Sequence, residues 1–297
     1  MWAARPPVTK WQRDAFLKGY DKEVDSSLCT RPDLAFITEI IDRPNDSTPG
    51  PDKIPFAAWR AASDLSGPVL FRVFEAIAKG HLPPVGFNHG LLFLLPKKDT
   101  GLVSDTRPLS VTNTDNRILA AAVARGIMPA VSAYVDPSQK GFLAGKDSGE
   151  HIVEINKLFY KAVTKKLSRI LFLLDTAKAF DSVDHDWVSH VLERVGFPRW
   201  LRNFVKGSLH AVKGAPFFGG DLLHWIDILR GVKQGCPLSP LLFIIAYDPL
   251  LHHISRLGTV RPFTCADDLA LFCHSVRDTS PALTLISQCR SERPDSA

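Results

Sequence analysis

The chain of 297 residues has few features of a membrane or secreted protein. None of its apolar stretches reaches the roughly 18 uninterrupted residues of a transmembrane helix. The longest candidate, residues 118–135, is broken by Arg125, Gly126 and Pro129. The N-terminus also lacks the continuous apolar segment of a secretory signal. The sequence therefore predicts an intracellular protein, nuclear or cytoplasmic, with no membrane partner.

Cysteine and net charge are both modest. The five cysteines are an odd number, and no two have the C-x-x-C spacing of a zinc site. Thiols in apolar surroundings behave as small hydrophobes, which favours a reducing compartment. The net charge of +5 permits a polyanionic partner without requiring one. With 45% hydrophobic and 23% charged residues and no internal repeat, the chain suits one large globular domain or two subdomains.

Three aspartates in two apolar contexts are the strongest positive signal. Asp175 ends the run ILFLLD, Asp267 and Asp268 lie within PFTCADDLALFC (262–273), and RGVKQGCPLSP (230–240) lies between them. Strands that bring carboxylates together can hold two divalent cations, which activate one oxygen and stabilise the leaving oxygen in phosphoryl transfer. Alone, the Asp pair would suit a hairpin turn, and a lone Asp after a strand would suit a turn or a helix cap. Their combination favours a nucleic-acid polymerase.

The strings around these aspartates resemble, in order and spacing, the reverse transcriptases of LINE-type, non-LTR retrotransposons. DTAKAFDSVDH (175–185) resembles their first carboxylate motif, QGCPLSP (234–240) their template and nucleotide loop, and CADD (265–268) their second carboxylate motif. Upstream, the resemblance extends to STPGPDKIP (47–55), LLPKKDT (94–100), RPLSVTNTDNRILA (107–120) and QKGFLAGKDSGEHI (139–152). It covers residues 46–274 approximately.

The resemblance implies an RNA-directed DNA polymerase that uses an RNA template, a DNA primer and deoxynucleoside triphosphates. It assigns two Mg²⁺ ions, with Mn²⁺ as the alternative, to Asp175, the Thr176 carbonyl and Asp267, and makes Asp268 the auxiliary carboxylate. Charge arguments agree with this assignment. Carboxylates so close together raise the pKa of at least one of them, and Mg²⁺ prefers a few carboxylates plus phosphate oxygens.

Nucleotide contacts are expected from further positions. The resemblance implies that the Phe180 ring excludes a 2′-hydroxyl and that Gln234 and Gly235 contact the nucleotide and the template. It also implies that Arg107, together with Lys97 or Lys98, neutralises the triphosphate. Phe180 is equally consistent with core packing, and either lysine with a solvated strand end. The basic run Lys157, Lys161, Lys165, Lys166 and Arg169 is consistent with a solvated face or with a face that follows phosphates.

Two features depart from the family pattern. Cys265 stands where the family usually has an aromatic residue, which alters packing near the primer end. Only 29 residues follow Asp268, so we expect the thumb to be missing. The competing interpretation is a decayed, inactive retrotransposon fragment with residual nucleic-acid binding. An RNA-templated RNA polymerase would use the same arrangement of carboxylates, but Phe180 argues against that activity. Protein partners cannot be predicted from the sequence.

The expected fold is α+β: the fingers and palm of a right-hand polymerase without its thumb. The expected divisions are an N-terminal extension (1–45), a fingers-like region (46–169), the palm (170–280) and a C-terminal helix and tail (281–297). Apolar patterns predict a strand at 91–95, a strand at 170–174 buried on both faces, and hairpins at 217–228 and 263–272. They also predict a helix capped at Ser66 and ended by Gly80, and helices at 118–131, 150–161, 186–195, from 198, at 241–251 and at 281–289.

Overall fold

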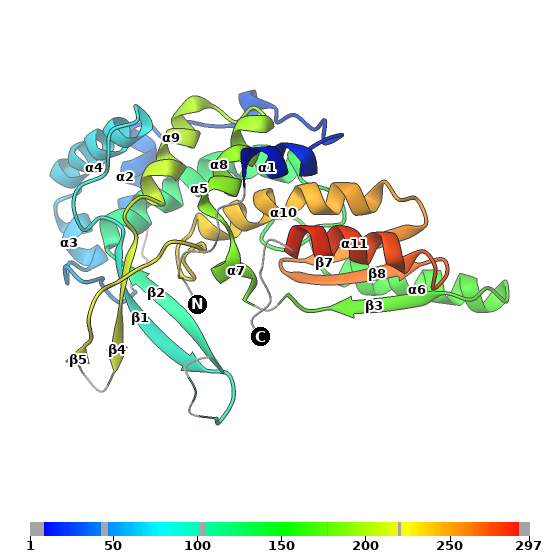
Figure 1. Ribbon diagram of the computed structural model, residues 1–297. Coiled ribbons are helices and arrows are strands. Elements are labelled where there is room, and N and C mark those ends of the chain that lie inside the picture. The colour runs from blue at the N-terminus through cyan, green and yellow to red at the C-terminus, as the bar shows by residue number, and fades with distance from the viewer. Residues whose placement is uncertain are drawn as a thin grey trace.

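The computed structural model describes residues 9–42, 47–100, 102, 105–176, 178–218 and 221–290. The fold mixes helices with two separate sheets, so the expected α+β class is confirmed. Figure 1 shows a helical body at the upper left, a long strand pair projecting below it, and a smaller sheet on the right. Helix α10 (Ser239–Ser255) runs across the molecule between these parts.

The helical body is built on α5 (Thr114–Tyr134), most of whose residues are buried. Small residues of the run AAAVARG let neighbouring segments approach closely: a Cβ at Gly126 would lie 2.3 Å from the carbonyl oxygen of Thr30. The other helices of this part are α2 (Leu34–Asp42), α3 (Phe56–Ala61), α4 (Ser63–Ala78), α8 (His185–Arg194) and α9 (Arg199–Ser208), with the 3₁₀ turn η1 (Ser26–Leu28). Helix α1 (Lys10–Phe16) lies apart from them, and its Phe16 packs towards α10.

The larger sheet has the order β2-β1-β4-β5, with β6 also paired to β4. Strand β1 (His89–Pro96) pairs antiparallel with β2 (Thr106–Thr112) and parallel with β4 (Lys213–Phe218). The short strands β5 (Asp221–Leu222) and β6 (Ile226–Asp227) complete it. The hairpin expected at 217–228 is thus present as the β4–β5 pair, although its Gly219-Gly220 turn lies outside the described residues.

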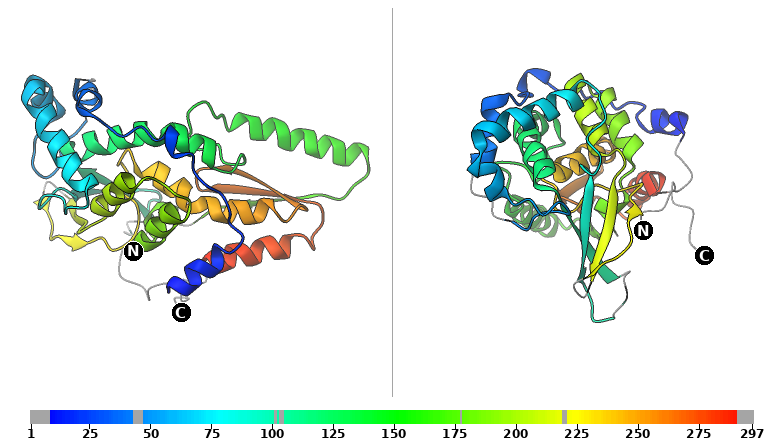
Figure 2. Two further views of the ribbon diagram at one scale, coloured as in Figure 1. Left: turned by 90° about the horizontal axis from the view of Figure 1, so that it is seen from above. Right: turned by 90° about the vertical axis from the view of Figure 1, so that its left-hand side faces the viewer.

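The smaller sheet has the order β3-β8-β7 and is antiparallel throughout. Its strands are β3 (Ile170–Leu174), β7 (Val260–Cys265) and β8 (Asp268–Cys273). Seen from above, the sheet lies between α6 (Gly149–Thr164) on one face and α10 with α11 (Thr279–Arg290) on the other (Figure 2). Alternating residues of β8 such as Leu269 and Leu271 join the core formed with α10 and α11.

The expectation that β3 is buried on both faces is wrong. Every residue of β3 keeps some exposure, and Leu173 is 76% exposed. The reason is its position: β3 is an edge strand, and the ring contacts of α6 with the sheet fall on β7 and β8. Phe172 and Leu174, on the opposite side of β3, pack towards the core of α10 and α11. An apolar run shows that a segment is a strand, but does not show how many neighbours cover it.

The start of α4 also differs from the expectation. The helix begins at Ser63, so Ser66 is not its N-cap and Pro68 lies inside it. The Ser66 hydroxyl instead donates to the backbone carbonyls of Trp59 and Ala62. The predicted end is confirmed, because α4 stops at Ala78 and Gly80 follows in the left-handed region at φ +100°. The remaining helices are found where they were predicted, with ends that differ from the expected ones by up to four residues.

The N-terminal segment contributes to the main core. Leu17, Tyr20 and Val24 are buried in the same apolar cluster as α5 and α10. The Tyr20 hydroxyl donates a hydrogen bond of 2.6 Å to Asp248 of α10, whose side chain is fully buried, and also contacts the Tyr134 hydroxyl. Burial and the negative charge of Asp248 raise the pKa of Tyr20, so the phenol stays protonated. The domain boundaries expected at residues 45, 169 and 280 stay predictions.

Candidate active site

The register of the smaller sheet brings the three aspartates to one end. Leu174 pairs with Leu269, so Asp175 leaves β3 at the point where Asp268 begins β8. Cys265 pairs with Asp268 across the hairpin, which leaves Ala266 and Asp267 as its two-residue turn. Ala266 has a φ of +58°, as the first position of such a tight turn requires. The hairpin expected at 263–272 is confirmed.

Electrostatic coupling shows that these carboxylates share one neighbourhood. Burial is the main cause that raises the pKa of Asp267 above its ordinary value. The negative charges of Asp268 and Asp175 raise it further, whereas the positive charge of Arg107 lowers it. Asp175 and Asp268 are exposed and Asp267 is half-buried. Arg107, which lies on β2 of the other sheet, is therefore near enough to act on the aspartates.

The donor set suits a hard divalent cation. Among the residues that the structure describes, no three His, Cys, Asp or Glu side chains are grouped closely enough to hold a metal ion by themselves. Magnesium does not require such a cage, because one or two carboxylates, water and substrate phosphates satisfy its octahedral shell. Besides burial, repulsion by Asp268 and Asp175 raises the pKa of Asp267, and a bound cation would relieve that repulsion. The chemistry of Asp175, Asp267 and the Thr176 carbonyl therefore fits Mg²⁺.

A buried amide supports the turn that carries Asp267. Gln139 is 1% exposed; its side-chain oxygen accepts from the Ala266 N–H at 2.8 Å, and its side-chain nitrogen donates to the Ala266 carbonyl at 3.0 Å. Gly141 lies against the same peptide, since a Cβ there would be 2.1 Å from the Ala266 nitrogen. Both residues belong to the string QKGFLAGKDSGEHI, but sequence reasoning assigned neither of them a role. The resemblance of that string to the family was the signal in the sequence that marked this segment.

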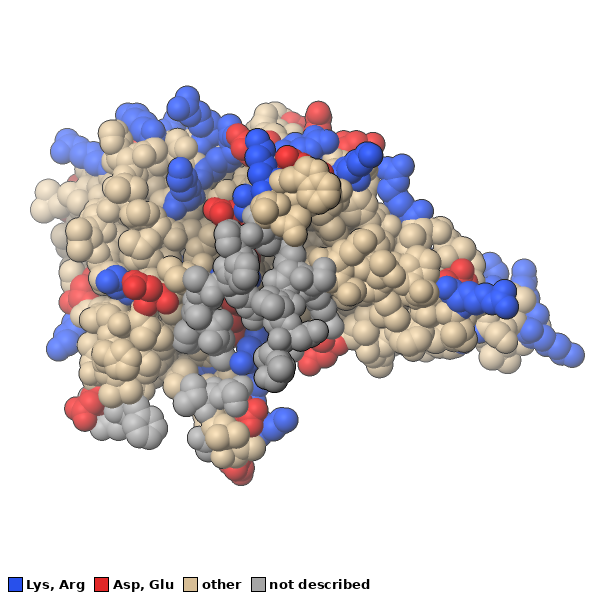
Figure 3. Space-filling view, in the orientation of Figure 1, with Lys and Arg blue, Asp and Glu red and all other residues tan. Residues whose placement is uncertain are grey.

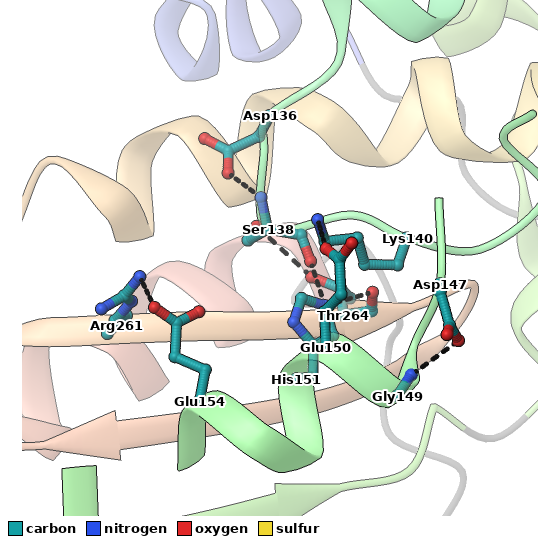
Figure 4. A network of polar contacts seen from close by, with 10 residues as sticks. All are labelled: Asp136, Ser138, Lys140, Asp147, Gly149, Glu150, His151, Glu154, Arg261 and Thr264. Atoms are coloured by element: carbon teal, nitrogen blue, oxygen red, sulfur yellow. Dashed lines mark hydrogen bonds and ion pairs between the residues drawn. The ribbon is translucent and has the colours of Figure 1, made fainter. Parts of the chain in front are cut away.

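Around Gln139 a polar network ties this segment to α6 and β7. The ring of His151, on α6, lies with Nε2 2.9 Å from the Ser138 carbonyl and 3.2 Å from the Thr264 carbonyl. Figure 4 shows His151 between these two segments, with Arg261 of β7 paired to Glu154 of α6 beside it. The hairpin with the Asp pair is thus held from outside the sheet as well as within it.

Phe180 lies on α7 (Ala179–Ser182), the short helix that follows Asp175. Its ring stacks on Phe243 of α10 at a centroid distance of 4.7 Å, and the edge of the Phe142 ring meets it at 5.9 Å. Phe180 keeps partial exposure. One face of the ring therefore packs, so the core interpretation holds in part, and its role beneath a sugar stays a prediction.

The loop with Gln234 and Gly235 lies against β2. The Gln234 carbonyl accepts from the Ser110 N–H at 2.7 Å. Gly235 has a φ of +111°, and a Cβ there would lie 2.8 Å from the Ser110 carbonyl oxygen. The glycine is required both by the backbone conformation and by the close approach of the strand. The loop therefore bridges the strand of Arg107 and the segment that follows Asp175.

The remaining basic residues are less closely placed. Lys97 and Lys98 are exposed just beyond β1, and the Lys97 backbone N–H bonds to the Asp105 carbonyl. The choice between the two lysines stays open. The lysines of α6 and the turn after it are exposed, and Figure 3 shows basic side chains at the right-hand tip of the molecule. Both interpretations of that face, solvated or phosphate-binding, therefore remain.

Comparison with known proteins identifies the family. Residues 95–293 match the model of the family described as reverse transcriptase (RNA-dependent DNA polymerase). The chain belongs to the reverse transcriptase family. The match includes the Asp175 strand, the Gln234 loop and the Asp267 hairpin, so the resemblance seen in the sequence is confirmed.

Similar curated proteins are products of mobile elements. The chain is 31% identical over 210 residues to the transposon TX1 uncharacterized 149 kDa protein of Xenopus laevis, covering 70% of this chain and 16% of that protein. It is 28% identical over 239 residues to the retrovirus-related Pol polyprotein from type-2 retrotransposable element R2DM of Drosophila melanogaster, covering 77% and 22%. A type-1 R2 polyprotein of Nasonia vitripennis is 26% identical over 257 residues, covering 80% and 23%. This reverse transcriptase chain thus spans less than a quarter of the length of these relatives.

In the part of the chain that the structure describes, no helix is both long and apolar enough to cross a bilayer.

Proposed function

We propose that this chain is the fingers and palm of an RNA-directed DNA polymerase, which joins deoxynucleotides to a primer 3′-hydroxyl on an RNA template. The observation that supports it most is the meeting of Asp175 with Asp267 and Asp268 at one end of the smaller sheet, where their charges act on one another. The family match points to the same chemistry.

In this proposal Asp175, the Thr176 carbonyl and Asp267 would hold two Mg²⁺ ions, or Mn²⁺ in their place, with Asp268 as an auxiliary carboxylate. When bound, the ions would activate the 3′-hydroxyl and stabilise the charge that develops on the phosphoryl and leaving oxygens. The protein supplies the geometry: the β3–β8 register fixes Asp175 beside the hairpin, and Gln139 fixes the turn of Asp267.

The other residues would bind and select the nucleotide. Arg107, whose charge lowers the pKa of Asp267, would neutralise triphosphate charge together with Lys97 or Lys98. The exposed part of the Phe180 ring would exclude a 2′-hydroxyl, and Gln234 with Gly235 would contact nucleotide and template. The lysines of α6 would follow the nucleic-acid backbone through salt-dependent phosphate contacts.

Primer extension with Mg²⁺ at low salt tests the proposal. We expect Asp175→Asn and Asp267→Asn each to abolish extension, because removing one oxyanion-stabilising group costs roughly 10²–10³ in rate and a metal ligand should cost at least as much. Asp21→Asn is the matched control: its side chain is 76% exposed and distant in sequence from the site, so it should leave the rate unchanged. Extension at the parent rate by either site variant would contradict the assignment.

A decayed fragment is the competing interpretation, since Cys265 departs from the family pattern beside the Asp pair. We expect the isolated chain to extend by few nucleotides, because duplex retention depends on phosphate contacts over a large surface. Fusing to Ala297 the segment that follows the matched region in a similar element should lengthen the products. Absence of extension with and without the fused segment would favour the decayed-fragment interpretation. Cys265→Phe would then be the first substitution to try, because it restores the aromatic residue of the family pattern.

A further inference from the structure

The Gln234 loop is joined closely to the segment that follows Asp175. Four contacts connect residues 230–232 to residues 180–185. They are the Gly231 N–H to the Val183 carbonyl at 2.8 Å, the Val232 N–H to the Phe180 carbonyl at 2.9 Å, His185 Nε2 to the Gly231 carbonyl at 2.8 Å, and the Arg230–Asp184 ion pair at 3.2 Å. These four contacts join the two segments side by side through both main-chain and side-chain groups.

Gly231 explains how the segments come so close. Its φ is +88°, and a Cβ there would lie between 2.9 and 3.1 Å from three backbone atoms of Asp181. Any side chain at this position would push the loop away from α7. The close approach brings the side chain of Gln234 within reach of Asp181.

Asp181 fixes the orientation of the Gln234 amide. The Asp181 residue is 7% exposed, and its Oδ1 accepts a hydrogen bond of 3.1 Å from Gln234 Nε2. An ionised carboxylate accepts hydrogen bonds but cannot donate them. The amide must therefore turn its nitrogen towards Asp181, which directs its oxygen Oε1 away from Asp181. The main chain of Gln234 is fixed independently, by the Ser110 N–H.

We propose that Asp181 is a positioning residue for nucleotide selection: it holds Gln234 so that Oε1 is presented as an acceptor to an N–H or O–H donor of the incoming nucleotide or its template base. The inference rests on the proposed polymerase function and deepens it. Asp181 acts through Gln234 and does not itself touch the nucleotide.

A double-mutant cycle tests this role. Gln234→Glu puts a second carboxylate about 3 Å from Asp181, and like charges this close repel. We expect KM for the deoxynucleotide to rise at least tenfold with a smaller change in kcat. Asp181→Asn in the same chain should recover most of the loss, because the Asn amide can donate to the new carboxylate. The loss in Gln234→Glu alone should also shrink as pH falls, since a shared proton restores the hydrogen bond.

The control is Asp186→Asn on α8, whose carboxylate is 75% exposed and which should match the parent. A double variant no better than Gln234→Glu alone would overturn the proposal. If neither the parent nor its fusion with the downstream segment extends a primer, the polymerase proposal fails, and hydrogen exchange then decides on Asp181. Backbone amides of residues 231–236 should exchange faster in Gln234→Glu and return to the parent rate in the double variant; unchanged exchange throughout would also overturn the role.

Discussion

Asp248→Ala should be among the most destabilising single changes in this chain. Asp248 lies on α10 with its side chain fully buried, yet it carries a carboxylate. Three groups donate to it: the Tyr20 hydroxyl at 2.6 Å, the Lys22 ammonium at 2.8 Å and the backbone N–H of Asp136. Removing the carboxylate leaves three donors without this acceptor at the junction of the N-terminal segment, α5 and α10.

The size of the effect follows from which donors can reach water. A buried donor left unsatisfied costs about 1–3 kcal/mol. Tyr20 is 0% exposed and cannot rehydrate without opening the core, whereas the Lys22 side chain is 22% exposed and can partly do so. The expected loss is about 3–5 kcal/mol, the range found when one partner of a buried ion pair is removed. Asp248→Asn keeps an acceptor of similar shape, so about 1–2 kcal/mol is expected.

Urea unfolding of the full chain, followed by circular dichroism, measures these differences. Asp21→Asn serves as the surface control, because this neighbouring carboxylate is 76% exposed and exposed ion pairs contribute about 0–1 kcal/mol. A loss of less than about 1 kcal/mol for Asp248→Ala would refute the reasoning. It would mean that the N-terminal segment does not dock on α10 as the structure has it.

Three further changes test the site and its surroundings. Phe180→Ala should increase ribonucleotide incorporation relative to deoxynucleotide in primer extension, and unchanged discrimination would assign the ring to the core alone. Burial raises the pKa of Asp115 to about 6, so the ionised carboxylate destabilises the folded state at higher pH. Asp115→Asn should therefore stabilise the chain at pH 7–8 by about 1 kcal/mol after solvent screening. In a pH series of thermal melts, this gain should vanish below about pH 4. Asp267→Asn should likewise raise the melting temperature at pH 7 without added metal, because the Asp267 pKa is also raised, and a lowered melting temperature would contradict the crowding of charge.

Local patterns predicted most of the elements, including those that carry the three aspartates. An apolar run ending in Asp175 and a hairpin around the Asp pair are signals within short windows, and both strands formed where they were expected. Their meeting depended on the two strands pairing, which the family resemblance supplied. The burial of β3 could not be read in the same way, because Leu173 is exposed only as a result of the sheet order.

The supporting residues were missed for a related reason. Gln139, Asp181 and Asp248 each act through a partner more than 50 residues away in the chain. In the sequence, a glutamine in a loop or an aspartate within a helix looks like an ordinary surface residue. Only the fold shows that these three are buried and hydrogen-bonded. Buried polar groups need hydrogen-bond partners, so the fold must bring these distant segments together in one defined arrangement.

These buried groups and the exposed aspartates form a consistent electrostatic arrangement. Gln139 satisfies the peptide of the Asp267 turn, and Asp181 accepts from the amide of Gln234, so the supporting hydrogen bonds are completed within the protein. Asp175 and Asp268 remain exposed, and their charges add to burial in raising the pKa of Asp267. A fold that satisfies its buried polar groups but leaves carboxylates crowded at one sheet end would be stabilised by a cation bound there. Under the proposed function, the same crowding that costs stability without metal would give the site its affinity for a divalent cation.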